Sequence, residues 1–155
     1  MSAMPDIGPL SPSAFRWRPF IAFEDTNLVG NVYFARFVSW QGRCREAFLA
    51  EHAPDVLTAL AGDLRLVTLS VSCDYFEELR AFDTVELEMR LAEQNGHRLR
   101  LGFDYWLERD GQRHLAARGA QAVGCMRDAG GGALVPAALP QSLAAALGAY
   151  QGGGE

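Results

Sequence analysis

The chain has 155 residues, 49% of them hydrophobic, and a formal net charge of -5 at pH 7. This length suits a single globular domain that buries a core of ordinary size. The acidic balance, together with the absence of a basic run interleaved with aromatic residues, excludes broad nucleic-acid binding, so any acidic partner has to meet a local arginine patch.

The N-terminal residues 1–13 contain three prolines and many small side chains, which predicts a flexible leader. This stretch lacks the charged start and apolar core of a signal peptide, and the chain contains no run of about 18 apolar residues. The three cysteines lie far apart, without the C-x-x-C spacing of a metal or redox site, which indicates reduced thiols. We therefore expect a soluble, cytoplasmic protein without a metal.

One long helix is the strongest local prediction. After a first strand expected over residues 14–23, residues 35–51 contain no helix-breaking residue except Gly42. Apolar side chains recur there at offsets of three, four and four residues: Phe37, Trp40, Cys44 and Phe48. Further apolar residues on the other faces predict a helix that is enclosed on nearly all sides, and a short second helix is expected after Pro54.

From Leu66 onward, apolar residues alternate with polar ones, which is the period of a half-buried strand. The apolar set of the first such strand is Val67, Leu69, Val71, Cys73 and Tyr75. Residues 85–91 and 99–107 repeat the pattern, and a last strand ends near residue 126. The dipeptides Asn95-Gly96 and Asp110-Gly111 separate these strands, and both predict tight hairpin turns.

Together these elements predict an α+β fold in which a curved, antiparallel five-stranded sheet wraps around one long central helix. A helix of roughly 17 residues spans only about 25 Å, which is too short to cover five strands and also be covered itself, so we expect subunits to pair. The domain is placed at residues 14–127. Residues 128–155 are predicted to form a glycine-rich flexible linker, a short C-terminal helix and a loose tail.

Several common catalytic arrangements are missing from the sequence. No G-x-S-x-G motif or phosphate-binding loop occurs, and the glycines at 130–132 belong to the predicted linker. The chain has three histidines, His52, His97 and His114. No nucleophile or carboxylate stands at the spacing of a catalytic motif from any of them, so none is assigned a catalytic role. A hydrolase with a serine-based triad is therefore not expected.

The stretch FEDTNLVGNVYFARFVSWQGRCREAFL, which begins at Phe23, and the antiparallel meander after it resemble the hotdog-fold thioesterases related to 4-hydroxybenzoyl-CoA thioesterase. The resemblance covers about residues 15–127 and implies the hotdog fold. In many members of that family, an aspartate of the motif attacks the thioester or activates water, and the matching position here is Asn27. The segments TNLVGNVYF and WQGRCRE are similar to the thioesterases of enediyne polyketide biosynthesis, which lack this carboxylate and release a polyene from an acyl carrier protein.

Asn27 is the first catalytic candidate. Its neutral amide is neither a nucleophile nor a useful base, but it can donate a hydrogen bond to a carbonyl oxygen or orient a water. Gly30 lets the backbone approach a ligand closely, and free N–H groups at the start of the following helix can face a developing oxyanion. The alternative is that Asn27 only fastens a turn or caps the helix. The nearest carboxylates, Glu24 and Asp25, are assigned to the turn or the surface.

Arg45 is the second catalytic candidate, because the resemblance implicates an arginine of WQGRCRE. Its guanidinium could neutralise an enolate or carboxylate of a 3-oxoacyl substrate. It lies about 15 Å along the helix from the first turn, so it reaches the same thioester as Asn27 only if the chain bends back or another subunit supplies one of the two. The alternative is a buried ion pair of Arg45 with Asp63 or Glu78.

Other side chains of this region are assigned to an apolar wall that binds the substrate: Tyr33, Phe34, Phe37, Trp40 and Gln41. Phe37 stands where some relatives carry a tyrosine. An aromatic stripe with this spacing also suits a plain helix core, so both roles stay open. Thr68 opens the polar face of the strand after the helix and is assigned a contact with the thioester across a subunit boundary.

The resemblance thus implies a thioesterase that hydrolyses a long polyene chain, of 3-oxoacyl type, from the acyl carrier protein of an enediyne-type iterative polyketide synthase, with decarboxylation able to follow. No cofactor is implied beyond the phosphopantetheine arm of the carrier protein. At least a homodimer is expected, and a homotetramer is the further expectation. Two alternatives stay open: a non-catalytic hotdog module that binds acyl chains or carrier protein, and a general acyl-CoA thioesterase.

Overall fold

The computed structural model of the protein describes residues 13–152, so the predicted leader lies outside the described residues except for Ser13. The helices are η1 (Phe23–Asp25, a 3-10 helix), α1 (Phe34–His52), α2 (Pro54–Ala61) and α3 (Gln141–Gly148). The strands are β1 (Phe15–Trp17), β2 (Leu64–Tyr75), β3 (Thr84–Asn95), β4 (Arg98–Arg109), β5 (Gln112–Asp128) and β6 (Leu134–Pro136). The predicted α+β class is confirmed.

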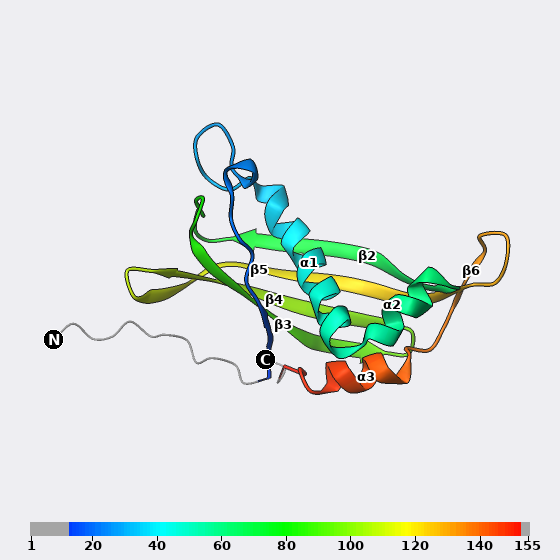
Figure 1. Cartoon of the computed structure of the whole chain (residues 1–155). Helices are drawn as coiled ribbons and strands as arrows, with labels where there is room; N and C mark the ends of the chain where they lie inside the picture. Colours follow the sequence, from blue (N-terminus) through cyan, green and yellow to red (C-terminus); the bar gives the residue numbers. More distant parts are fainter. Residues whose placement is uncertain (1–12, 153–155) are drawn as a thin grey trace.

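The strands form one antiparallel sheet in the order β1-β3-β4-β5-β2, and the short β6 also pairs with β5. Helix α1 lies across one face of this sheet, while α2 and α3 gather near one end of it (Figure 1). The side chains of α1 that were predicted to share one face are buried in the core: Phe37, Trp40, Cys44 and Phe48. The predicted hotdog architecture, one long helix packed on an antiparallel sheet, is confirmed.

Helix α1 spans 19 residues, one more at each end than predicted. The expectation that it is enclosed on nearly all sides is wrong for the single chain, because Phe34, Arg43 and Glu46 are exposed. The sheet covers only the stripe that carries the buried aromatic residues. One face of α1 is therefore open in the single chain.

The first strand is shorter than the predicted 14–23. Only Phe15–Trp17 pair with β3, and the chain leaves the sheet before Pro19. Proline has no N–H to donate to a strand ladder, which ends the pairing there. The chain then forms the 3-10 helix η1 ahead of α1.

Strand β2 departs from strict alternation, because its register against β5 shifts between Thr68 and Ser70. Across such a bulge, the alternation of side chains between the two faces of the sheet shifts by one residue. Thr68 pairs with the buried Val123 and contacts α1, whereas Leu69 packs on Gly124. The prediction that Val67 to Tyr75 present one continuous apolar face is therefore wrong at its start, and Thr68 is turned toward the helix.

Both predicted hairpins are confirmed. In the second, Asp110 and Gly111 have φ of +55° and +72°, the positive values that a two-residue type I′ turn requires. In the first, the loop is shifted by one position: β3 runs through Asn95, and Gly96 with φ of +61° is the first loop residue.

The segment after β5 is more ordered than the predicted flexible linker. Its residues 134–136 form β6 on β5, which makes the sheet six-stranded rather than five-stranded. Helix α3 then returns to cover the core with Leu143 and Leu147, because these two apolar side chains lie on one helical face. Within residues 13–152, no helix is long and apolar enough to cross a bilayer.

Candidate functional site

A groove of about 370 Å³ opens beside the start of α1. Its walls come from the loop before α1, the first turn of α1 and the segment that follows β2. The lining residues are Asn27, Asn31, Val32, Tyr33, Phe34, Phe37, Tyr75, Phe76, Glu77, Glu78 and Leu79. The groove therefore brings together four predicted site residues: Asn27, Tyr33, Phe34 and Phe37.

Asn27 begins a tight turn at the rim of this groove. Its side-chain oxygen Oδ1 accepts a hydrogen bond from the N–H of Val29 at 3.1 Å, and its carbonyl oxygen accepts one from the N–H of Gly30 at 3.0 Å. Because Oδ1 is engaged, the orientation of the amide is set, and its Nδ2 group makes no hydrogen bond to residues 13–152. Asn27 thus fastens a turn, as in the alternative role, and still offers a free N–H donor at the groove.

Gly30 lies at the tip of the same turn with φ of +92°, a region that favours glycine. A Cβ at this position would meet no atom within 4 Å. The positive φ of this turn therefore accounts for a glycine at position 30, and no bound ligand is needed to explain it. Gly30 is not among the residues that line the groove.

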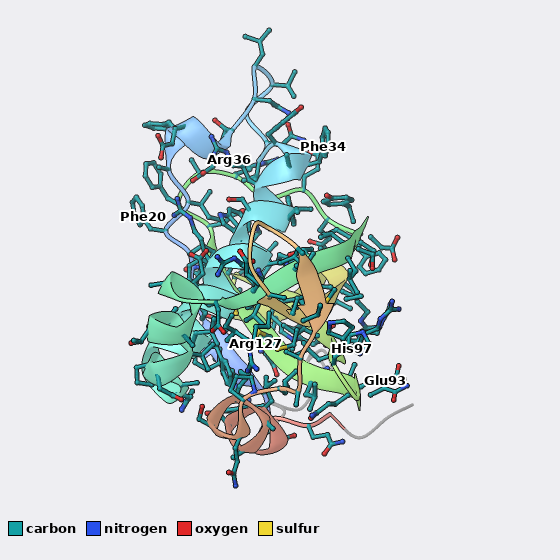
Figure 2. The ribbon with its side chains drawn as sticks, turned by 90° about the vertical axis from the view of Figure 1, so that its right-hand side faces the viewer. Phe20, Phe34, Arg36, Glu93, His97 and Arg127 are labelled. Atoms are coloured by element: carbon teal, nitrogen blue, oxygen red, sulfur yellow. The ribbon has the colours of Figure 1, made fainter. Side chains whose placement is uncertain are left out.

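Tyr75 ties the two walls of the groove together, since its hydroxyl donates to the carbonyl oxygen of Phe34 at 2.9 Å. Burial, with a smaller contribution from Cys73, raises the pKa of Tyr75 to about 12, so the hydroxyl stays protonated at neutral pH. Phe34 projects on the side of α1 opposite Phe20 (Figure 2). The first turn of α1 has no side-chain cap, so backbone N–H groups at this end are available to a ligand.

Two carboxylates that were not assigned to the site, Glu77 and Glu78, also line the groove. Glu77 is 3.8 Å from the Nδ1 of His114, and Glu78 makes no hydrogen bond or ion pair within the described part of the chain. They follow the end of β2, where exposed charged residues are common, and no local signal linked them to Asn27. Asp25 is different, because it is buried and accepts a hydrogen bond from the N–H of Ala22 at 2.9 Å.

Arg45 lies further along α1, away from this groove. Its Nη1 group donates to Thr68 Oγ1 at 3.2 Å and to Gln121 Oε1 at 3.1 Å. The structure thus brings together the predicted residues Arg45 and Thr68, and it adds Gln121, which the sequence analysis missed. The alternative of an ion pair with Asp63 or Glu78 is wrong: no carboxylate in residues 13–152 pairs with Arg45.

A small cavity of about 20 Å³ adjoins Arg45 on the side of α3. Apart from Arg45, its lining is apolar: Phe48, Leu49, Leu66, Met89, Leu99, Leu101, Val123, Leu143 and Leu147. A space of this size holds about one water-sized group. An acyl chain can enter beside Arg45 only if these side chains move apart.

Trp40 and Gln41, which were predicted as channel wall, are buried between the two regions. The ring of Trp40 packs on Phe37 with centroids 5.4 Å apart, and Gln41 Nε2 donates to the carbonyl oxygen of Ser72 at 3.1 Å. Neither residue lines the groove or the cavity beside Arg45. In the single chain both are core residues, the role that the sequence had left open.

The groove and the Arg45 region are separate in the single chain. From Phe34 to Arg45 the helix rises by roughly 16 Å, and Tyr75 and Thr68 are separated by roughly 23 Å along β2. Asn27 and Arg45 of one copy of the chain therefore do not share one cavity.

Comparison with known proteins places this architecture in a family. Residues 21–147 match the thioesterase-like superfamily. The acyl-CoA thioester hydrolase YbgC of Escherichia coli O6:H1 is 26% identical over 87 residues, which are 56% of this chain and 65% of the relative. This chain thus covers slightly less than two thirds of the length of the curated relatives that it matches.

Solved structures agree with this match. The dynemicin thioesterase, whose crystal structures describe induced-fit and allosteric effects upon polyene binding, has a TM-score of 0.85 and 48% identity, over 89% of this chain and 97% of that chain. The 4-hydroxybenzoyl CoA thioesterase of Pseudomonas sp. strain CBS-3 has a TM-score of 0.75 and 13% identity, over 86% and 99%, a similarity that concerns the fold alone. With one long helix packed on an antiparallel sheet and a family match over most of its length, the chain belongs to the thioesterase-like superfamily.

Proposed function

We propose that this protein is a thioester hydrolase that releases a long polyene chain, of 3-oxoacyl type, from the acyl carrier protein of an enediyne-type iterative polyketide synthase. The observation that carries the proposal is Arg45, a half-buried cation held by two neutral side chains in a member of a thioesterase-like family. The 48% identity with a thioesterase studied with polyenes supports the substrate class.

Asn27 is proposed to hold the thioester carbonyl. Its free Nδ2 group and the uncapped N–H groups at the start of α1 can donate to the carbonyl oxygen, which becomes an oxyanion when water attacks. A C–O bond forms to the water oxygen, the C–S bond breaks, and a proton from the water passes to the departing thiolate of the phosphopantetheine arm. Loss of one such donor typically raises the barrier by about 3 kcal/mol.

Arg45 is proposed to balance negative charge on the acyl part. When the released acid has a 3-oxo group, it gives its proton to water, and the carboxylate loses carbon dioxide to leave an enolate. Protonation of that enolate by water gives a methyl ketone. A guanidinium stabilises both the carboxylate and the enolate. This step needs no cofactor, and the hydrolysis uses only the arm that the carrier protein brings.

A second copy of the chain is proposed to bring the two regions together. Strand β2 ends the sheet opposite β1, and its outer edge carries exposed apolar side chains: Leu69, Val71 and Tyr75. A free edge of this length can pair with another strand. If two copies of β2 pair antiparallel about Ser70 and Val71, Thr68 of one copy lies opposite Cys73 of the other, two residues from Tyr75 and its groove.

This pairing would place Arg45 of the second copy near the groove that holds Asn27. It makes a homodimer the smallest active unit, and pairing of dimers into a homotetramer is a further part of the proposal. Light scattering after size-exclusion chromatography measures the number of copies. A monomer with full activity would contradict the shared site.

The test of hydrolysis compares wild type with Asn27→Ala and Glu78→Gln on synthase-loaded acyl carrier protein, with free acid followed by mass spectrometry. We expect Asn27→Ala to lower kcat by about a hundredfold and Glu78→Gln to change it little. Asn95→Ala, in a distant hairpin, is the control for a surface amide. A large loss in Glu78→Gln, or trapping of an acyl group on Glu77 or Glu78, would replace the proposed mechanism with one based on a carboxylate.

Assays that compare an acyl-CoA ester with the loaded acyl carrier protein distinguish two other functions. The relative named acyl-CoA thioester hydrolase favours a general acyl-CoA thioesterase, which predicts faster turnover of the CoA ester than of the carrier-protein ester. A non-catalytic module that binds acyl chains or carrier protein predicts binding without release by wild type. The free thiols Cys44, Cys73 and Cys125 are compatible with the proposed cytoplasmic location.

A further inference from the structure

Arg45 differs from every other arginine that is at least partly buried in residues 13–152. The others each have a carboxylate oxygen at 2.7 to 3.8 Å: Arg16, Arg36, Arg65, Arg90, Arg109 and Arg113. Arg45 alone among them has only neutral acceptors, the hydroxyl of Thr68 and the amide oxygen of Gln121. Burial lowers the pKa of Arg45, with an opposing effect of Glu46 that is smaller. Among the arginines of residues 13–152 that are at least partly buried, Arg45 is thus the one whose charge no carboxylate compensates.

Gln121 is the better placed of the two acceptors to hold Arg45. It is buried, with 4% of its surface exposed, and it lies on β5 between the Cα partners Leu101 and Val71. Its strand face is otherwise formed by glycine and apolar residues, where an unpaired amide would be costly. The hydrogen bond of 3.1 Å from Arg45 Nη1 satisfies its oxygen. The remaining guanidinium nitrogens of Arg45 make no hydrogen bond to the described residues and stay available to a ligand.

We propose that Gln121 is a positioning residue that fixes the guanidinium of Arg45 through a neutral acceptor and so keeps its positive charge free for an anionic ligand, the carboxylate or enolate end of an acyl chain. The inference deepens the proposed function and rests on its assignment of the acyl group to the Arg45 region. A glutamate at position 121 would bind Arg45 more strongly, because the attraction between two opposite charges would add to the hydrogen bond. It would also cancel the charge. The neutral amide of Gln121 therefore holds the guanidinium of Arg45 in place without cancelling its positive charge.

Gln121→Glu separates these two effects. The probes are dodecanoate, a carboxylate with an alkyl chain, and dodecanol, a neutral molecule with the same chain, and binding of each is measured by titration calorimetry. We expect Gln121→Glu to weaken dodecanoate binding by about tenfold to a hundredfold and to leave dodecanol binding within about twofold of wild type. Thermal unfolding should show a native state that is as stable as wild type or more stable.

Ala122→Glu is the matched control. It adds the same charge one residue further along β5, on the opposite face of the sheet, where the Cα partner is Arg100. We expect it to bind both probes as wild type does. A loss of dodecanoate binding in this control would mean that long-range charge, and not contact with Arg45, sets the affinity.

Other outcomes would overturn the role of Gln121. These are unchanged dodecanoate binding in Gln121→Glu, an equal loss of both probes, and no binding of dodecanoate to wild type. Should Gln121→Glu fail to fold, Gln121→Met serves instead: it removes the acceptor without adding charge, and the same selective loss of the carboxylate probe, by about threefold to tenfold, is expected. Both probes lack a thioester, so absence of hydrolysis by wild type would refute the proposed function and leave this inference standing.

Discussion

Gly119 is the residue whose replacement tests the packing between α1 and the sheet most sharply. A Cβ at this position would lie 2.1 Å from Gln41 Nε2 and 2.7 Å from the carbonyl oxygen of Ser72. Real Cβ atoms do not approach other heavy atoms so closely, so the Gln41 side chain has to move and its hydrogen bond to Ser72 has to break. Gly119→Ala therefore forces a change in the core without altering any polar group directly.

The expected cost of Gly119→Ala follows from two contributions. Loss of a buried hydrogen bond costs about 1 to 3 kcal/mol, and an extra methyl group in a packed core costs about 1 to 3 kcal/mol. We expect the free energy of unfolding, measured by urea denaturation, to fall by about 2 to 6 kcal/mol. Gly102→Ala is the control, because its Cβ would have only Arg90 Cγ at 3.8 Å as a neighbour, and it should leave stability unchanged or raise it by up to about 1 kcal/mol.

The double variant Gly119→Ala with Gln41→Ala decides whether this mechanism is correct. Gln41→Ala removes the nearer of the two atoms that collide with the new methyl group, so the cost of Gly119→Ala should be smaller in this background by about 1 to 2 kcal/mol. Strictly additive costs, or wild-type stability of Gly119→Ala alone, would refute the close packing of Gln41 against β5.

Three further predictions concern buried polar groups. Tyr105→Phe removes the hydroxyl that donates to the carbonyl oxygen of Phe37 at 2.6 Å, and should cost about 1 to 2 kcal/mol in urea unfolding. Burial raises the pKa of Cys44 to about 12 from the usual 9.0, so a thiol reagent at pH 8 should not label this residue until the protein unfolds. As the pH rises, the Cys44 thiol ionises in the unfolded chain before it ionises in the folded protein. The contribution of Cys44 to stability is therefore present below pH 9.0 and is lost as the pH rises toward about 12. Arg113→Ala removes a 2.7 Å partner from the buried Glu88, leaving its longer contacts with Arg90 at 3.5 Å and Arg16 at 3.8 Å, and should lower the free energy of unfolding by about 3 kcal/mol. Part of the loss should be recovered by adding Glu88→Gln. No recovery would mean that lost packing, and not the weaker charge pairing of Glu88, causes the cost.

Much of the fold was predictable because local chemistry dictates it. The spacing of Phe37, Trp40, Cys44 and Phe48 identified the helix and its buried face, and all four are in the core. Asp110-Gly111 identified a hairpin, because few residue pairs accept two successive positive φ angles. Errors arose where a single residue interrupts a pattern, as Pro19 does after β1.

The candidate site was only partly predictable. The resemblance singled out Asn27, and the structure shows its amide donor at a groove. The same groove also holds Glu77 and Glu78, whose positions after a strand end carried no signal in the sequence. Gln121 was missed because a single polar residue in an apolar strand looks like an exception until its partner is known.

The sequence by itself determined the elements of this protein: an amphipathic helix of the right length, strands of period two, and the turns that join them. Only the tertiary structure decided that Arg45 meets Thr68 and Gln121, which are 23 and 76 residues away in the chain. The reason is physical. Periodicity reports which side of an element is apolar, whereas the meeting of three side chains depends on a bulge in β2 and on the register between β2 and β5, and both are set by the packing of the whole sheet.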